Sequence, residues 1–258
     1  MTMPYFAESP VAPLGLALVD VSEARGADSA RSRSATPART GGLDMLLAAA
    51  SATRRRVRRG EYLYRYGDSF QSLFGIRAGS FKSVLLTEDG REQVTGFHLG
   101  GDVLGIDGIG LDVHAGDAIA LEDSEVVEIP FAELDALATR DPQLQRELFR
   151  MLSAEIQRER ALMLLLGSMR AEERLAAFLI NLSQRMATRG FSASCFVLRM
   201  TREEIGSMLG LKLETVSRIL SRFQSEGLIQ VRNREIAIVS LSALRAVIGR
   251  SDARRDAR

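Results

Sequence analysis

The stretch from Met200 to Ser240 constrains the fold more than any other part of the chain. Thr201 and Glu204 have the Thr-x-x-Glu spacing of a capping box, which predicts that a helix begins just after Thr201. Gly210 predicts a sharp turn at the end of that helix, because glycine adopts positive φ without strain. A second helix is expected from about Lys212 to Glu226, with apolar residues at helical spacing on one side: Val216, Ile219, Leu220 and Phe223. Two short helices around a glycine turn predict a helix-turn-helix.

The exposed face of the second helix is suited to reading DNA bases. In a helix-turn-helix this helix enters the major groove with its N-terminal part at the base edges. Arg218 can donate two hydrogen bonds to guanine, Glu214 can accept one from cytosine, and Ser217 can donate or accept. A carboxylate lowers affinity for phosphate, so Glu214 favours sequence-specific binding over simple adhesion. The alternative is that Glu214 only complements the helix dipole.

A wing follows the two helices. "LIQVRNREIAIVS" predicts two alternating strands joined at Asn233-Arg234, and Arg232 and Arg234 at this tip would reach phosphate. A further strand is expected at Phe196–Met200. Residues 168–258 hold 16 Lys and Arg against 9 Asp and Glu, whereas the rest of the chain holds 18 against 24. The C-terminal part is therefore the one expected to meet double-stranded DNA. Its predicted contact residues are Thr201, Arg202, Lys212, Glu214, Thr215, Ser217, Arg218, Arg232 and Arg234.

The middle of the chain has a different texture. From Arg54 to Phe131, short β-branched or aromatic runs alternate with glycines, which predicts an all-β sandwich or barrel. The Asp-Gly of "TEDGRE" (Thr87 to Glu92) is typical of a hairpin. Asp141-Pro142 then predicts the start of a helix that runs for roughly 25 residues to Leu166.

This long helix carries an apolar stripe formed by Leu144, Leu148, Met151, Leu152, Ile156 and Met163. The stripe can pack against its own domain or form a seam between two copies of the chain. We expect a homodimer, because the helix is long and precedes a second domain. Glu155 and Glu159 interrupt the stripe: they either repel their mates across the seam and make dimerisation conditional, or lie at its solvated rim. The predicted dimerisation residues are Leu148, Leu152, Glu155, Ile156, Glu159 and Met163.

Composition excludes several classes of protein. The chain has 258 residues and a single cysteine, Cys195, which rules out an intramolecular disulfide and a cysteine-based zinc or iron–sulfur site. The sequence shows neither an apolar stretch of roughly 20 residues nor a signal peptide, so a cytoplasmic protein without a membrane partner is expected. Residues 1–42 contain four of the six prolines and predict a flexible tail.

From Leu43 to Ile248 the sequence resembles the FNR branch of the CRP/FNR transcription regulators. The resemblance rests on "GFHLGGDVLGIDGIG", "EIPFAELDAL", "AEERLAAFLINLSQR", "RGFS" and "GLKLETVSRILSRFQ". It implies an α+β fold with a cyclic-nucleotide-binding-like β-roll (43–140), a long dimerisation helix (141–167) and a C-terminal winged helix-turn-helix (168–258). It also implies a palindromic target with TTGAT-like half-sites, since Glu214, Ser217 and Arg218 match the branch's base-reading residues. Lys212 and Leu213 depart mildly from the usual "LTVET" spelling, so the resemblance does not fix the preferences at flanking bases.

The resemblance further implies contacts with RNA polymerase. Two exposed loops match such contacts in the family: Thr87 and Gly90 lie in "TEDGRE", and Phe191 and Ser192 lie in "RGFS". The resemblance implies an activator. Arg91, however, replaces the acid that is usual in the first loop, which argues against activation through that loop, and repression stays open.

The sensor of the FNR branch is missing. The family's iron–sulfur cysteines lie in the N-terminal tail and in the roll, where Val127 takes the matching place. A cyclic nucleotide would need a basic partner, yet the chain from Glu92 to Thr139 has eleven acids and neither Lys nor Arg. No cofactor is therefore expected. An unidentified small ligand or oxidation of Cys195 is the alternative input, and a passive role for Cys195 stays open.

The sequence argues against two other classes of protein. A cupin-like enzyme would need clustered His and Glu ligands, but His98 and His114 lack the His-x-His spacing, so neither a metal site nor an enzyme is expected. A packaging protein without sequence preference would present a uniformly basic helix, which Glu214 contradicts.

Overall fold

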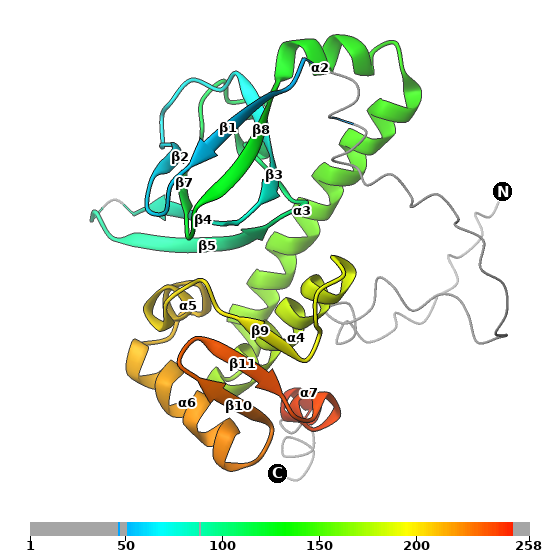
Figure 1. Ribbon diagram of the computed structural model, residues 1–258. Helices are drawn as coiled ribbons and strands as arrows, with labels where there is room; N and C mark the ends of the chain where they lie inside the picture. Colours follow the sequence, from blue (N-terminus) through cyan, green and yellow to red (C-terminus); the bar gives the residue numbers. More distant parts are fainter. Residues whose placement is uncertain (1–45, 47–50, 88, 250–258) are drawn as a thin grey trace, which may run out of the picture. The chain divides into compact units, whose positions relative to one another are not determined.

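The computed structural model describes residues 46, 51–87 and 89–249, and the tail expected at residues 1–42 lies outside them. The first part is a roll of two four-stranded antiparallel sheets, ordered β1-β8-β3-β6 and β2-β7-β4-β5 (Figure 1). The predicted all-β domain is confirmed. Its strands are β1 (Thr53–Val57), β2 (Tyr62–Tyr64), β3 (Ser72–Ala78), β4 (Ser80–Leu86), β5 (Glu92–Leu99), β6 (Val103–Leu104), β7 (Asp117–Ala120) and β8 (Ser124–Pro130), with a short 3-10 helix, η2 (Ile106–Gly108), after β6.

The two sheets enclose an apolar core. It takes buried side chains from both sheets, among them Ile76, Phe81 and Val126. Gly79 makes the turn from β3 to β4 with φ of 92°, and a Cβ there would lie 2.1 Å from Ser124 Oγ. Only glycine permits this close approach. The predicted Asp-Gly hairpin is confirmed as the connection between β4 and β5.

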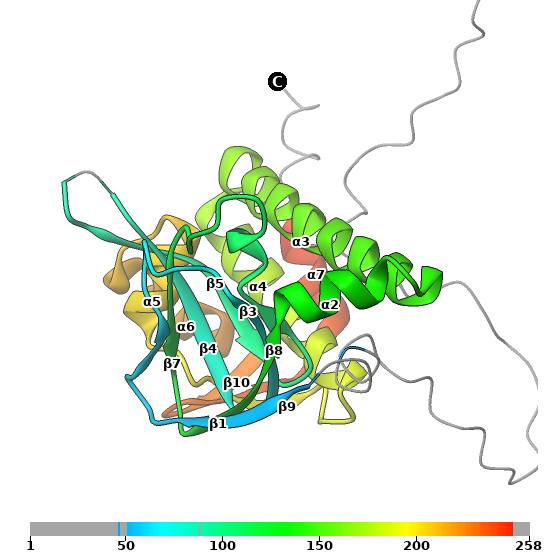
Figure 2. The ribbon, with the colours of Figure 1, turned by 90° about the horizontal axis from the view of Figure 1, so that it is seen from above.

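Two helices follow the roll, α2 (Phe131–Ala138) and α3 (Pro142–Ser168). The predicted start of the long helix is confirmed: Asp141 caps α3 by accepting a hydrogen bond from Gln143 N at 2.8 Å, and Pro142 is the first helical residue. Seen from above, α3 passes along one side of the roll (Figure 2). Its first turns pack on the roll through Leu144, which is fully buried.

The winged helix-turn-helix predicted for the C-terminal part is confirmed. Thr201 and Glu204 form the capping box at the start of α5, and Gly210 ends α5 with φ of 64°. The buried side of α6 consists of the four predicted residues. The elements are α4 (Ala171–Thr188), β9 (Cys195–Val197), α5 (Arg202–Leu209), α6 (Leu213–Ser225), β10 (Ile229–Arg232), β11 (Glu235–Ile238) and α7 (Leu241–Gly249), and the sheet order is β10-β11-β9.

One strand differs from its prediction. The strand expected at Phe196–Met200 is β9, and it begins at Cys195 and ends at Val197. The reason is its partner: β9 pairs with β11, whose first residue, Glu235, lies opposite Val197. Cys195 is thus the first residue of the strand rather than the residue before it.

A single apolar cluster extends from the roll into the winged helix. It joins Val94 and Phe97 of β5 to Phe178 of α4 and to Ile205 of α5. Among the residues described, no helix is long and apolar enough to cross a membrane.

Candidate nucleic-acid interface

Helix α6 presents a polar face at its N-terminal end. Its four apolar residues anchor the opposite side, which leaves Lys212, Glu214 and Arg218 exposed and Thr215 and Ser217 half-buried. Within the described part of the chain, the side chains of Lys212, Glu214 and Arg218 have no hydrogen-bond or ion-pair partner. Two cationic donors, Lys212 and Arg218, and one anionic acceptor, Glu214, are therefore free at the end of α6 that would meet base edges.

Two of the predicted contact residues touch each other across the motif. Arg202, the first residue of α5, lies with Nη1 3.1 Å from Ser217 Oγ on α6. Thr201 directs its side chain to Glu204 N at 3.1 Å, so its hydroxyl serves the capping box. Sequence reasoning placed each residue on the motif but missed the contact, because it joins residues on two different helices.

Arg222 has a structural task that sequence reasoning missed. It lies on the exposed side of α6, but it forms an ion pair with Glu226 at 2.7 Å and a second one with Glu172 of α4. The hydrogen bond to Glu226 and the charge of Glu172 raise the pKa of Arg222. The spacing of Arg222 and Glu226 was a signal for the first pair, whereas the link to α4 needed the tertiary structure.

The wing tip lies next to the start of the two helices. Asn233 makes the turn with φ of 57°, and Arg232 and Arg234 beside it are exposed as predicted. Asn233, Arg234, Thr201 and Arg202 line one cavity of about 280 Å³. Wing and helices thus present one continuous surface, as phosphate contacts by the wing require.

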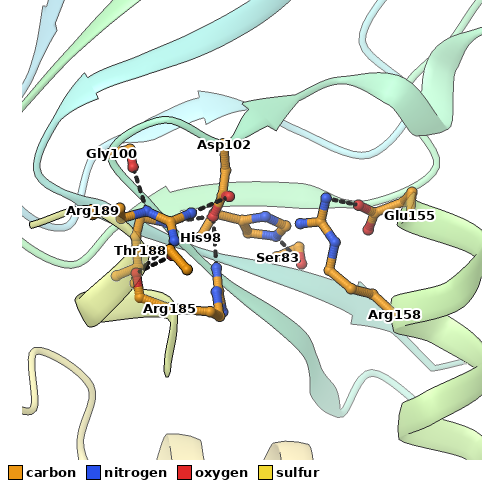
Figure 3. A network of polar contacts seen from close by, with 10 residues as sticks. Ser83, His98, Gly100, Asp102, Glu155, Arg158, Arg185, Thr188 and Arg189 are labelled. Carbon is orange, nitrogen blue, oxygen red and sulfur yellow. Dashed lines mark hydrogen bonds and ion pairs between the residues drawn. The ribbon is translucent and has the colours of Figure 1, made fainter. Parts of the chain in front are cut away.

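A buried ion cluster joins the winged helix to the roll (Figure 3). Asp102, in the turn between β5 and β6, lies 2.6 Å from Arg185 Nη2 and 2.6 Å from Arg189 Nη2, both on the last turn of α4 or just beyond it. Arg189 Nε also donates to Gly100 O at 2.6 Å. Burial raises the pKa of Asp102, but the two guanidinium groups outweigh it and hold that pKa below its ordinary value.

A second polar link ties the roll to the helix-turn-helix itself. Lys82 Nζ of β4 lies 2.9 Å from Glu204 Oε1, and both side chains are largely buried. Val94 N of β5 donates to Ser207 Oγ at 2.9 Å. Glu204 therefore serves both the capping box of α5 and the contact with the roll.

His98 lies next to this cluster and is hydrogen-bonded. Its Nε2 is 2.9 Å from Ser83 Oγ, and its Nδ1 has no partner within the described residues. Burial lowers the pKa of His98 to about 4, which outweighs the opposite influence of Asp102. His98 is thus neutral near neutral pH.

The stripe on α3 is divided between two environments. Leu144, Leu148 and Met151 pack on the roll of their own chain, so the own-domain interpretation holds for the first turns. Further along, Phe149, Ile156 and Met163 are 58%, 49% and 66% exposed. They are spaced seven residues apart and form an apolar line on one face of α3. Sequence reasoning missed Phe149.

The two glutamates of this stripe have different surroundings. Glu155 is half-buried, and Arg158 Nη2 lies 3.1 Å from its Oε2 without the geometry of a hydrogen bond. Burial raises the pKa of Glu155. Glu159 is exposed and has no ion-pair partner among the described residues.

A cavity of about 540 Å³ lies between the roll and α3. Leu152 and Ile156 of α3 line it together with four carboxylates, Asp107, Asp117, Glu155 and Glu159. None of the described residues that line it is Lys or Arg.

The loops predicted to contact RNA polymerase are accessible. Thr87, Gly90 and Arg91 are exposed, Arg91 pairs with Asp89 at 2.6 Å, and position 88 lies outside the described residues. Phe191 is also exposed, while Ser192 Oγ accepts a hydrogen bond from Cys195 N at 3.0 Å.

Cys195 is exposed, but its surroundings do not activate it. Its Sγ donates a hydrogen bond to Glu235 Oε1 at 3.2 Å, and this bond raises the pKa of the thiol. The thiolate is the reactive species, so this arrangement favours the passive interpretation.

Comparison with known proteins identifies two domains. Residues 54–141 match the family described as cyclic nucleotide-binding domain, and residues 173–247 match the Crp-like helix-turn-helix domain. The transcriptional regulatory protein btr of Bordetella pertussis is 49% identical over 196 residues, which cover 76% of this chain and 81% of that protein. The fumarate and nitrate reduction regulatory protein of Salmonella typhimurium is 47% identical, with 76% and 78% covered. The chain belongs to the CRP/FNR family of transcription regulators.

A solved structure supports the assignment to the CRP/FNR family. FixK2 from Bradyrhizobium japonicum has a TM-score of 0.69 and 34% sequence identity over 76% of this chain and 96% of that one. The predicted resemblance and α+β fold class are thereby confirmed. The family consists of transcription regulators rather than enzymes.

The residues of this CRP/FNR regulator do not fit a cyclic nucleotide. A cyclic phosphate carries a negative charge and needs a basic partner, whereas the cavity between the roll and α3 presents four carboxylates. The carboxylate of Glu155 is half-buried, and an anion next to it would add repulsion to the cost of its burial. The residues do not fit an iron–sulfur cluster either, since the sequence has one cysteine and it lies on the wing sheet.

We expect that cyclic AMP does not stabilise the purified protein. Bound at a thousandfold excess over its Kd, a ligand adds about 4 kcal/mol to the free energy of unfolding. Thermal denaturation with millimolar cyclic AMP should leave Tm unchanged, and 5′-AMP is the control for unspecific effects. An increase in Tm with cyclic AMP alone would show that the cavity accepts the nucleotide.

We also expect His98 to make the protein less stable in mild acid. Because the pKa of His98 is lower in the folded than in the unfolded chain, the unfolded chain binds more protons between about pH 6.5 and pH 4, and stability falls as the pH falls. The loss from pH 7 to pH 5 should be about 2 kcal/mol. Urea denaturation of the wild type and of His98→Gln measures it. If both lose the same stability over this interval, His98 is not the cause.

Proposed function

We propose that this protein is a sequence-specific transcription regulator that binds a TTGAT-like palindrome as a homodimer and contacts RNA polymerase. The observation that carries the proposal is the pair of free, oppositely charged side chains, Glu214 and Arg218, on the exposed face of α6. A guanidinium can bond guanine with two hydrogen bonds, and a carboxylate accepts from cytosine, so the pair favours a particular order of bases. The nearby Arg232 and Arg234 supply phosphate contacts.

The C-terminal half of α3 supports a dimer. Phe149, Ile156 and Met163 recur every seven residues, which is the repeat of a coiled-coil seam. Leu152 and Glu159, three residues after Phe149 and Ile156, take the other seam position. An exposed apolar line of this kind is stabilised by burial against a second copy. Glu159, which has no ion-pair partner in the described part of the chain, would face its mate across that seam.

The exposed loops around Gly90 and Phe191 support contacts with RNA polymerase. Phe191 is a large apolar side chain in contact with solvent, which is typical of residues that anchor a protein partner. Four regions are proposed to divide these tasks: the tail 1–42, the roll 43–140, the dimerisation helix 141–167 and the winged helix 168–258.

A ligand-responsive regulator is the second candidate function. It is favoured by the cavity of about 540 Å³ in the roll, and its effector would be a small molecule without a phosphate. Control by oxidation of Cys195 is less favoured, because Glu235 raises the pKa of the thiol.

Sequence-specific binding is tested with two duplexes of equal length and composition. The palindrome of TTGAT half-sites should bind at least ~10³-fold more tightly than its scrambled version at the same salt concentration. The measurement is made in air without added ligand by fluorescence anisotropy. Equal affinity for both duplexes would contradict the proposal.

Dimerisation is tested with two substitutions on α3. Glu159→Ala removes the like charge from the proposed seam and should strengthen the dimer several-fold, as expected for a repulsion of about 1 kcal/mol. Met163→Glu should weaken it by at least as much. Sedimentation equilibrium gives the monomer–dimer constant. The idea of a repulsive seam fails if this constant is the same for the wild type and Glu159→Ala.

A further inference from the structure

The hydroxyl group of Ser217 is held by a cation on one side. Arg202 Nη1 on α5 lies 3.1 Å from Ser217 Oγ on α6. A guanidinium has N–H donors and no acceptor, so Arg202 donates and Ser217 accepts. One lone pair of the hydroxyl is therefore occupied before any DNA is bound.

The proton of this hydroxyl group has no acceptor within the described residues. Serines inside helices often donate to the carbonyl four residues earlier. Ser221 does so, with Oγ 3.0 Å from Ser217 O, and Ser168 does so with Leu164 O at 2.6 Å. Ser217 makes no such bond in the described structure. Its O–H remains available on the polar side of α6.

We propose that Arg202 is a positioning residue that turns Ser217 into a hydrogen-bond donor toward the bases. The inference rests on the proposed function, because it specifies how the reading face discriminates. A free serine hydroxyl can donate or accept. Here the guanidinium polarises the O–H, and an N–H that approached the second lone pair would meet the positive charge of Arg202.

The consequence is a rule for one base position. Thymine O4, guanine O6 and N7, and adenine N7 are acceptors in the major groove, whereas cytosine presents only its N4 donor. The base that faces Ser217 should therefore be any base but cytosine. Arg202 would set specificity without touching a base, in contrast to Arg232, which has no partner in the described structure and is free to contact phosphate.

The test uses the full chain and a set of palindromic duplexes that differ by one base pair, changed symmetrically in both half-sites. Ser217→Ala first locates the base pair that Ser217 reads, because discrimination disappears there. The wild type should reject cytosine at this position about 10-fold or more. Arg202→Met should reduce that rejection about 5-fold or more at this position and leave discrimination at the other positions unchanged.

Three further variants make the result decisive. Arg232→Met removes one phosphate contact from each subunit of the dimer, so it should weaken binding to all duplexes equally and lower the dependence of log K on log salt by about two units. Ser221→Ala should change no discrimination, because its hydroxyl is occupied. The double variant Arg202→Met with Ser217→Ala should discriminate no less than Ser217→Ala alone, since both remove the same interaction.

The inference is overturned if Arg202→Met behaves like Arg232→Met, with a uniform loss and a reduced salt dependence. It is also overturned if the two substitutions have additive effects at the base pair in question. Arg202 is exposed, and circular dichroism verifies that Arg202→Met folds. Arg202→Gln keeps one N–H donor group, so it should retain part of the discrimination against cytosine. Failure of the proposed function is distinct, because the wild type itself would then bind the palindrome and the scrambled duplex equally.

Discussion

The placement of the helix-turn-helix depends on one buried carboxylate. Asp102 has a side chain only 10% exposed, and it lies between the guanidinium groups of Arg185 and Arg189. An isolated buried charge costs several kcal/mol, and the two guanidinium groups, which are themselves largely buried, offset this cost for Asp102. The cluster joins the turn after β5 to the end of α4, and α4 belongs to the same apolar core as α5 and α6. Roll and winged helix are thus held together by charge as well as by apolar packing.

The second link, between Lys82 and Glu204, acts on the helix-turn-helix directly. Glu204 completes the cap of α5 through Thr201 N, and the cap determines where α5 begins. Arg202 is the next residue, so its reach to Ser217 depends on this helix start. A contact with the roll is in this way connected to the surface proposed to read bases. The connection consists of successive contacts between neighbouring residues, and it is a structural link between the roll and α6.

The two halves of the protein differ in how much chemistry they retain from their family. Among the described residues, the face of α6 carries an unpaired carboxylate, Glu214, and an unpaired guanidinium, Arg218, beside the hydroxyl of Ser217 that we propose Arg202 orients. Base discrimination requires groups of these kinds. The cavity of the roll is lined by carboxylates, which is opposite to what an anionic nucleotide needs. The chain therefore has the helix-turn-helix domain of a CRP/FNR regulator, while its sequence holds too few cysteines for an iron–sulfur sensor.

The sequence by itself determined the local structure: the capping box at Thr201, the cap at Asp141, the turn at Gly210 and the buried side of α6 all depend on residues a few positions apart. Such spacings are visible in a single chain, because helix and turn rules are local. The sequence predicted a strand at Phe196–Met200, whereas β9 has only three residues and ends at Val197. The difference arises because the length of a strand depends on its partner. The sequence also did not show which apolar residues of α3 pack on the roll, such as Leu144, and which form the exposed line that includes Phe149. Only the tertiary structure decided which charges pair, because Asp102 with Arg185, Lys82 with Glu204 and Arg202 with Ser217 join residues that the fold, not the sequence, makes neighbours.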